Sequence, residues 1–339
     1  MRLQILVPQY EETFDVIKPL LDSIALQQNV DFDQVGVIIC NDGSDVILSD
    51  EDLKGYPFRI DYYKEAHRGV SGTRNACLDH SKAKYVMFCD ADDMFFNMCG
   101  LYILFREMEK DGFDSLVSAF VEESRNPKDR DEVVYVNHEM DSTFVHGKVH
   151  RRQYLIDNNI RWNNDLTIHE DSYFNCLAQR LGKEVKYCQT PFYLWKWRDD
   201  SVCRHDPKYI LKTFNNMLDS NTALVNQFLQ RRRKEDAQFF ATSMIYDSYF
   251  TLNKKEWIEQ ENQDYRNAVE KRFARYYKEF KNLYDSIPEE AKNQIIVGIK
   301  NRMFGEGLMM ESITFDDWIK NIEKLIDEDA ENESSNDSE

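Results

Sequence analysis

Three short apolar runs in the first hundred residues each end in a polar cluster, and this repeat limits the fold more than any other feature. The runs are "LQILVPQ", "QVGVIIC" and "KYVMFC", followed by "YEE", "NDGSD" and "DADD". Each run is typical of a buried strand, and the first is expected to stop at Pro8. The stretches "FDVIKPLLDSIALQQ" and "SGTRNACLDHSK" between them have helical patterns. This alternation predicts an α/β, Rossmann-like fold with a mostly parallel central sheet.

The polar clusters are expected to meet in one cleft. In open α/β sheets, ligands bind beyond the carboxyl ends of the strands. Residues 8–11, 42–44 and 90–92 all lie at such ends. The sequence therefore predicts a binding site formed by these three segments.

The second part of the chain has a different pattern. After about Asp206 the sequence contains long helical stretches, which predict a helical C-terminal domain. We expect an α/β domain over residues 1–206, with a nucleotide-binding half (1–95) and an acceptor half (96–206). The helical domain then covers 207–326, and a homodimer through it is possible. Residues 327–339 carry seven acids and no base, which predicts a disordered tail.

Composition excludes several classes of protein. A formal net charge of −18 disfavours a broad surface that grips nucleic-acid phosphates. Seven cysteines without a C-x-x-C pair disfavour a disulfide framework or a zinc ribbon. No apolar run approaches the length of a membrane span, and the apolar N-terminal stretch is too short for a signal peptide. A soluble, cytoplasmic protein is expected.

Clustered acids follow the third apolar run. Asp90 and Asp92, one residue apart on a turn, can hold a divalent cation from one side and leave positions for phosphate oxygens and water. Alternatively, Asp92 or Asp93 caps a helix that begins near Met94. The residues themselves support both interpretations equally.

The wider context favours the cation. Over roughly the first 205 residues the chain resembles the family-2 glycosyltransferases, which are nucleotide-sugar enzymes with the GT-A fold. The matching segments are "ILVPQYEE", "CNDGSD", "HRGVSGTRNACL", "YVMFCDADD", "VHGKVHRRQYL", "HEDSYF" and "PFYLWKWRDDSVCRH". Each motif alone is weak, but their order and spacing agree with the family.

The resemblance implies roles for the residues on the donor side. The nucleotide-sugar site would comprise Pro8, Tyr10, Glu11, Asp42, Arg74, Asp90, Ala91, Asp92, Gly147 and Arg198. In such enzymes the residue at Asp42 hydrogen-bonds the base, typically uracil, and those at Asp90 and Asp92 hold Mn²⁺ or Mg²⁺. His205 is a candidate third ligand of the metal. Simpler explanations remain, because Asp42 with Gly43 can form a plain turn.

Other basic and aromatic residues have two interpretations each. Arg74 would lie near the sugar or diphosphate, or else on a helix surface. Lys148, Arg151 and Arg152 would contact phosphate or acceptor, or else form a solvated helix face. The aromatic residues Trp195 and Trp197 suit sugar rings or the core equally.

The acids in "HEDSYF" resemble the x-E-D element at the start of a helix in this family. By this resemblance Asp171 is the general base and Glu170 its neighbour, although such acids also complement a helix dipole. The implied activity is metal-dependent, inverting transfer of one sugar from a nucleotide-diphosphate donor, a UDP-sugar, to a hydroxyl acceptor. A glycan, a protein or a modified nucleobase would serve as acceptor. The alternatives are a nucleotidyltransferase, for which a glycine-rich N-terminal loop is missing, and a non-catalytic scaffold.

Overall fold

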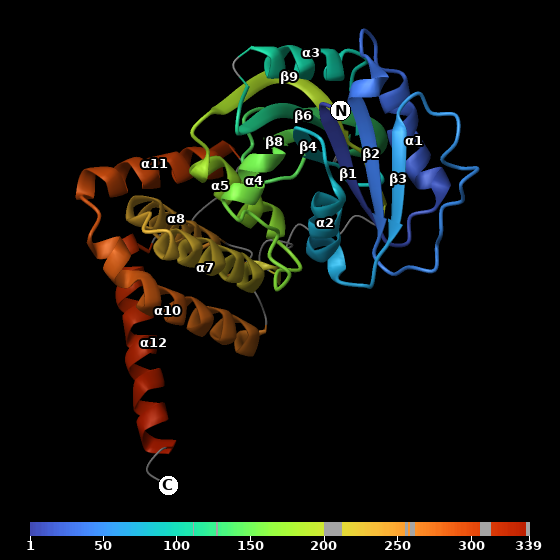
Figure 1. Ribbon diagram of the computed structural model, residues 1–339. Helices are drawn as coiled ribbons and strands as arrows, with labels where there is room; N and C mark the ends of the chain where they lie inside the picture. The colour runs from blue at the N-terminus through green and yellow to red at the C-terminus, as the bar shows by residue number, and fades with distance from the viewer. Residues whose placement is uncertain are drawn as a thin grey trace. The chain divides into compact units, whose positions relative to one another are not determined.

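The chain forms two compact units, Met1–Ser201 and Val202–Glu339, in a computed structural model (Figure 1). The structure describes residues 1–110, 112–126, 128–199, 212–254, 257, 262–305 and 313–336. Within these ranges, the side chains of residues 302–305 and 328–336 are not described.

The first unit contains the sheet and the shorter helices. Its strands are β1 (Leu3–Gln9), β2 (Val35–Asn41), β3 (Arg59–Lys64), β4 (Tyr85–Phe88), β5 (Met94–Phe95), β6 (Ser115–Asn126), β7 (Asp129–His138), β8 (Lys148–Arg151) and β9 (Val185–Trp195). Its α-helices are α1 (Phe14–Ala25), α2 (Gly69–His80), α3 (Gly100–Glu109), α4 (Arg152–Asp157) and α5 (Glu170–Leu181).

The strands form one mixed sheet in the order β3-β2-β1-β4-β8-β6-β9-β5, with β7 paired to β6. The half β3-β2-β1-β4 is parallel, as the strand and helix pattern predicted. Beyond it, β8 pairs antiparallel with both β4 and β6, and β9 runs parallel to β6. The parallel half therefore brings the carboxyl ends of β1, β2 and β4 to one edge.

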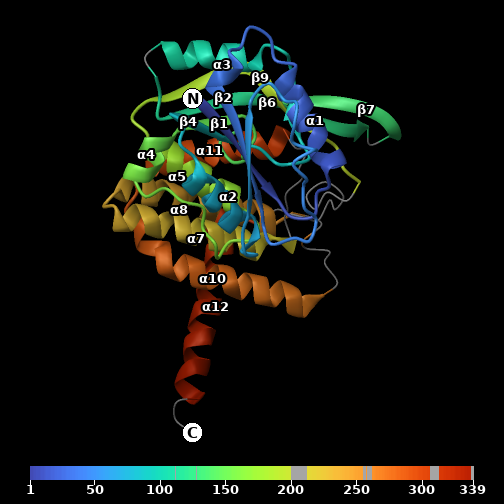
Figure 2. The same cartoon turned by 45° about the vertical axis from the view of Figure 1, so that its right-hand side comes forward.

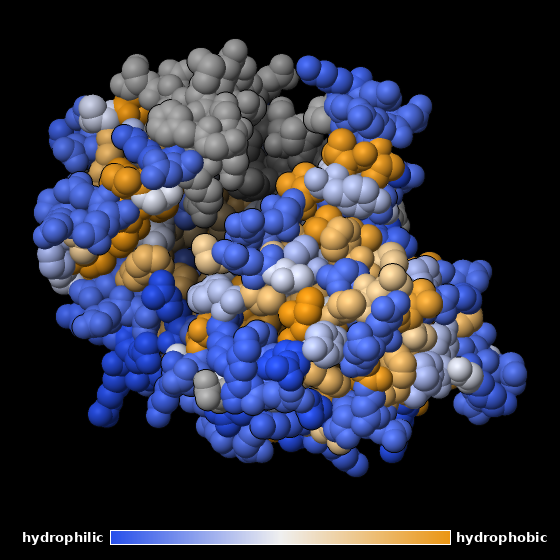
Figure 3. All heavy atoms as spheres, turned by 90° about the horizontal axis from the view of Figure 1, so that it is seen from above, coloured by the Kyte–Doolittle hydropathy of each residue, from blue (hydrophilic) through white to orange (hydrophobic). Residues whose placement is uncertain are grey.

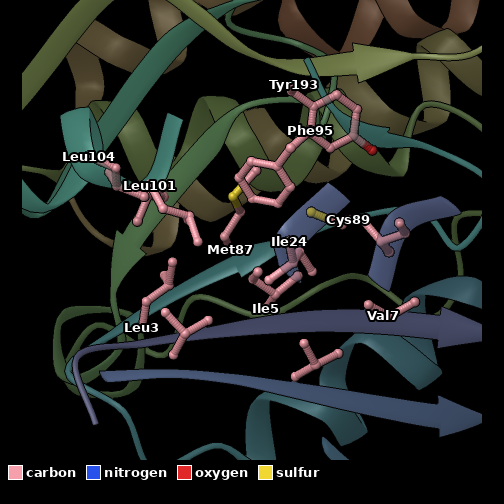
Figure 4. Packing of buried hydrophobic residues seen from close by; sticks show 14 of the residues in the cluster. Leu3, Ile5, Val7, Ile24, Met87, Cys89, Phe95, Leu101, Leu104 and Tyr193 are labelled. Atoms are coloured by element: carbon pink, nitrogen blue, oxygen red, sulfur yellow. The ribbon is translucent and has the colours of Figure 1, made fainter. Parts of the chain in front are cut away.

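Alternation along the strands divides the core between the two faces of the sheet. Leu3, Ile5 and Val7 of β1 are fully buried and pack with α1 and α3 in one hydrophobic cluster (Figure 4). On the other face, α2 packs against β1 and β2. The sheet is therefore covered on both sides, as expected for parallel strands.

Two local predictions were wrong. β1 continues through Pro8, which pairs in register with Cys40 of β2. Pairing of β1 with β4 ends at Leu6, so at Pro8 the strand is paired with β2 alone. A proline, which has no backbone N–H, is tolerated where a strand is paired on one side only. No helix starts near Met94: β5 begins there and α3 begins at Gly100. The acids at 90–93 therefore do not cap a helix.

A β-hairpin projects from the sheet of this unit. β6 and β7 pair antiparallel from Phe120 and His138 outward, as Figure 2 shows. Tyr135 at the outer part of β7 is 61% exposed, so this hairpin contributes little to the core. Figure 3 looks down on the side that carries α3, where hydrophobic and hydrophilic residues are mixed.

The second unit is helical, as predicted. Its described helices include α7 (Phe214–Gln230), α8 (Lys234–Leu252), α10 (Gln263–Asp285), α11 (Glu289–Gly305) and α12 (Phe315–Asn336). The sequence patterns did not predict α11, and α12 extends into the segment expected to be disordered. Phe273 and Trp318 stack with their ring centroids 5.0 Å apart, so aromatic side chains join α10 to α12. Among the described residues, no helix has the length and apolar character needed to cross a bilayer.

Candidate active site

A buried arginine joins three carboxylates that come from distant parts of the sequence. Arg74 Nη2 donates to Asp90 Oδ1 at 2.8 Å, and Nη1 donates to Asp171 Oδ1 at 2.8 Å and to Glu170 Oε1 at 3.0 Å. Arg74 is only 3% exposed. The structure therefore brings together the predicted donor-side acid Asp90 and the predicted acceptor-side acids of α5.

Local structure explains why these groups converge. α2 lies against the parallel half of the sheet, and its Arg74 guanidinium carbon lies 4.4 Å from the centroid of the Trp162 ring. His169, just before α5, has φ = 64°, an uncommon left-handed conformation for a non-glycine residue. Because α5 begins directly after it, Glu170 and Asp171 lie in the first turn. Arg74 is thus a buried cation and not a surface helix residue.

The cluster changes the ionisation of its members. Burial alone would lower the pKa of Arg74, but Asp171, Asp90 and Glu170 raise it above its ordinary value. Burial raises the pKa of Asp90, yet the charge of Arg74 more than offsets this and holds that pKa below its usual range. Burial also raises the pKa of Asp171, to about 7, although Arg74 opposes the shift. Asp171 can therefore exchange a proton near neutral pH.

A second group of side chains has the chemistry of a cation site. Asp90, Asp93 and His146 each offer one ligand atom, and these atoms lie within 4.8 Å of one another. Burial lowers the pKa of His146 to about 3, so its ring is neutral at pH 7. His146 is 3% exposed and its Nδ1 has no hydrogen-bond partner. Two carboxylates with an unpaired, neutral imidazole fit a divalent metal ion.

This group differs from the set predicted from the sequence. Asp92 does not join it, because its Oδ2 pairs with Arg198 Nη1 at 2.9 Å. His205 lies outside the described residues. Asp93 accepts from Tyr193 Oη at 2.5 Å and from the Lys196 backbone N–H at 2.9 Å. Sequence reasoning considered Asp93 only as a cap.

His146 was missed altogether. Its only signal is its place beside the predicted Gly147 in "VHGK". Its ring lies in an aromatic group, with centroids 4.9 Å from those of Tyr193 and Trp195. These contacts bury the ring, and nothing in the local sequence pattern predicts them.

The predicted nucleotide side forms a separate cluster at the ends of β1 and β2. Asp42 is 4% exposed, and its two carboxylate oxygens accept from the backbone N–H groups of Arg68 at 2.7 Å and Gly69 at 2.9 Å. His67 Nδ1 lies 2.9 Å from Asp42 Oδ2, and its ring lies 5.0 Å from that of Tyr10. Two exposed rings thus stand beside a buried carboxylate.

The remaining predicted donor residues differ in their exposure. Pro8 is partly buried within β1, Glu11 is exposed after it, and Ala91 is buried between the acids. Gly147 has φ = 67°, and a Cβ there would lie 2.3 Å from Ser118 Oγ. Close packing against β6 therefore explains this glycine without any ligand.

The basic residues after Gly147 are structural in this arrangement. Lys148 is 1% exposed on β8, with its Nζ 3.7 Å from Asp141 Oδ1. Arg151 pairs with Asp114, and Arg152 Nε donates to Ser81 Oγ at 2.9 Å. For Lys148 and Arg151 the predicted alternative of a solvated helix face is therefore wrong, because both belong to β8, whereas Arg152 begins α4.

Comparison with known proteins agrees with this geometry. Residues 4–168 match the family model described as "Glycosyl transferase family 2". This part of the chain belongs to glycosyltransferase family 2. The family implied by the motifs is thus confirmed.

Curated relatives are more distant. The chain is 25% identical over 220 residues to the "uncharacterized glycosyltransferase EpsJ" of Bacillus subtilis, with 59% of this chain and 62% of EpsJ covered. It is 32% identical over 94 residues to the "minor teichoic acid biosynthesis protein GgaB" of the same organism, covering 24% of this chain and 10% of GgaB. The chain spans less than two thirds of the length of these relatives.

Solved structures confirm the fold. TarS 1-349 of S. aureus in complex with UDP superimposes with a TM-score of 0.60 at 14% identity, covering 82% of this chain and 80% of that one. The same protein in complex with UDP-GlcNAc gives 0.59 at 16% identity, covering 81% of each chain. The mixed sheet with a helical C-terminal region is therefore the GT-A arrangement that the sequence predicted.

Proposed function

We propose that this protein transfers one sugar from a nucleotide-diphosphate donor, a UDP-sugar, to a hydroxyl acceptor with inversion at the anomeric carbon. The observation that carries the proposal is the Arg74 bridge between Asp90 and Asp171. It places the acids of the predicted donor site and the predicted general base around one cation. The match of residues 4–168 to family 2 also supports this chemistry.

The nucleotide is proposed to bind at the ends of β1 and β2. Tyr10 is 45% exposed, which leaves a ring face for a base, and the Asp42 carboxylate beside the neighbouring His67 offers hydrogen-bond acceptors. The complexes of TarS with UDP and UDP-GlcNAc support a uridine donor by likeness of fold. Arg74 would then help to neutralise the diphosphate.

A divalent metal ion is proposed to bind at Asp90, Asp93 and His146. An imidazole ligand favours Mn²⁺ over Mg²⁺, which prefers oxygen ligands. When bound, such an ion would offset the charge that develops on the departing diphosphate.

Asp171 is proposed to act as the general base. Its carboxylate would take the proton of the acceptor hydroxyl while that oxygen bonds to the anomeric carbon. The bond from this carbon to the phosphate oxygen breaks in the same displacement, and the diphosphate leaves with the electron pair. A pKa of about 7 suits a base that works near neutral pH.

The acceptor class is left open among a glycan, a protein side chain and a modified nucleobase. The formal net charge of −18 makes a nucleic-acid acceptor the least favoured of these. Identification of the acceptor requires assays with each class.

Calorimetric titration tests the donor part of this proposal. UDP, GDP, CDP and TDP would be titrated against wild type and Asp90→Ala, each with and without Mn²⁺. We expect binding of UDP that Mn²⁺ strengthens in wild type and does not strengthen in Asp90→Ala. Absence of nucleotide binding under every condition would contradict the enzymatic function and favour a scaffold.

A further inference from the structure

One face of α5 holds the loop that precedes β8 by its backbone. Asp171, Asn175 and Gln179 are spaced four residues apart on the helix, so they lie along the same side. Each hydrogen-bonds the main chain of residues 142–145. The helix therefore binds the backbone of this loop, whatever side chains the loop carries.

The contacts run in order along the two segments. Gln179 Nε2 donates to the Ser142 carbonyl at 3.1 Å. Asn175 Nδ2 donates to the carbonyls of residues 143 and 144 at 2.9 and 3.0 Å. Asp171 Oδ2 accepts from the Val145 N–H at 3.0 Å. The last contact fixes one oxygen of the predicted base, while Arg74 holds the other.

Asn175 is the middle one of these three residues and makes two of the four hydrogen bonds to the loop. It is fully buried, and its Nδ2 serves two carbonyls, but its Oδ1 has no hydrogen-bond partner. A buried polar atom without a partner is unfavourable for folding. In return for this cost, the amide supplies two hydrogen bonds to carbonyls of the loop. Its donors therefore point to a role in fixing the loop.

The opposite side of the loop is also held. The Asp141 carboxylate accepts from the backbone N–H groups of Thr143 at 2.8 Å and Phe144 at 2.9 Å. The ring of Phe144 lies 5.5 Å from that of His146, centroid to centroid. The loop thus connects the cation group with Asp171, and its position matters to both.

We propose that Asn175 is a positioning residue, which holds residues 142–145 against α5 and thereby orients the Asp171 carboxylate toward the acceptor. Its contribution to transfer rests on the proposed function. The hydrogen bonds by which it fixes the loop, and through the loop Asp171, do not depend on that function. The two parts can be tested separately.

The first test follows the loop and Asp171 directly in Asn175→Ala. Hydrogen exchange of the Val145 amide should become at least about tenfold faster than in wild type. Asp171, titrated by carboxyl NMR, should ionise at a higher pH because it loses a donor to its charged form. The other charged groups around it, Arg74, Asp90, Glu170 and Lys148, are unchanged.

A control separates this effect from the loss of a side-chain amide that bonds a backbone carbonyl elsewhere in the fold. Asn158 Nδ2 donates to the Tyr154 carbonyl at 2.9 Å at the end of α4. Asn158→Ala should leave both the Val145 exchange and the Asp171 titration as in wild type. If Asn175→Ala fails to fold, Asn175→Ser provides a milder loss of the same donors.

The second test measures turnover with UDP-GlcNAc as donor and water as acceptor. In Asn175→Ala we expect kcat to fall about ten- to hundredfold per folded molecule, with UDP affinity unchanged. A folded variant with wild-type Val145 exchange and Asp171 titration would overturn the inference, as would unchanged turnover. Failure of wild type to bind UDP would instead count against the proposed function, and the exchange and titration results would still decide the role of Asn175.

Discussion

Arg74 lies 2.8 Å from Asp171 through a hydrogen bond that spans 97 residues of sequence. The same guanidinium carries the only positive charge that is bonded directly to Asp90 among the contacts of the described residues. Removal of this side chain would leave three half-buried carboxylates without their shared counter-charge. The pair therefore links stability to the ionisation of the site.

Arg74→Met should destabilise the protein by about 3–5 kcal/mol, the usual cost of breaking a buried ion pair from one side. The pKa of Asp90 is lowered in the fold, so its stabilising effect is present above the unfolded carboxyl pKa and is lost as the pH falls. The loss in Arg74→Met should therefore be larger at pH 8 than near pH 2. Urea unfolding at both pH values measures it.

Arg161→Met provides the control for this prediction. Arg161 forms an ion pair with Asp79 in which the side chains are 36% and 61% exposed. Loss of such a surface pair should cost at most about 1 kcal/mol. Equal losses in the two variants would show that Arg74 is not the counter-charge of the cluster.

Asp171 should have the opposite effect on the pH dependence of stability. Its pKa is raised to about 7 in the fold, above the ordinary unfolded value, so the folded state holds a proton that the unfolded state has released. Between about pH 4 and 7 this group lowers the free energy of unfolding as the pH rises, by at most about 4 kcal/mol. Asp171→Asn should lack that part of the slope. Parallel stability curves for the two proteins would disprove the raised pKa.

The same pKa predicts the pH profile of the reaction. If Asp171 must be ionised to accept a proton, turnover of the donor should rise with pH and level off above about pH 7. Stopped assays of UDP release from pH 5 to 9 measure this limb. Asp171→Asn should keep UDP affinity and lose turnover. Normal turnover in that variant would exclude Asp171 as the base.

The sequence predicted the parallel half of the sheet because each strand there has its own local pattern. It also predicted that segments 8–11, 42–44 and 90–92 lie at strand ends, which follows from alternation and chain direction. The sequence did not predict the contacts between side chains of neighbouring strands. The burial of His146 depends on rings from β6 and β9, and no local spacing records that packing.

Other features that the sequence did not predict also have physical explanations. α11 lacks a regular amphipathic pattern, so periodicity did not reveal it. The contacts of Arg74 depend on how α2, the turn after β4 and the start of α5 come together in the fold. Its own motif shows only an arginine in a helix. The sequence predicted Gly147 as a contact of the donor, whereas the structure explains the glycine by its close approach to Ser118.

Gly147→Ala should destabilise the fold whether or not a ligand binds. The residue has φ = 67°, and an added Cβ would lie 2.3 Å from Ser118 Oγ. Left-handed strain and the clash together should cost about 2–4 kcal/mol. Ser118→Gly in the same chain should recover the part due to the clash. Thermal unfolding of both variants without nucleotide measures this, and an unchanged transition in Gly147→Ala would contradict the close packing.

The choice between two metal sites gives the sharpest test of the active site. Geometry groups Asp90 with Asp93 and His146, whereas the motif predicts Asp90 with Asp92. Asp92 is already paired with Arg198, so its removal should leave much of the metal affinity intact. His146→Gln, which removes the unpaired imidazole nitrogen, should weaken Mn²⁺ binding about 10- to 100-fold.

Electron paramagnetic resonance of free Mn²⁺ measures both affinities without any substrate. His80→Gln is the matched control, because His80 Nε2 pairs with Glu65 at 2.7 Å on the far end of α2 and has no part in the cation group. Weak binding in His146→Gln with near-normal binding in Asp92→Ala would establish the site seen in the structure. The reverse pattern would restore the D-x-D pair, and would require Arg198 to release Asp92 when the metal binds.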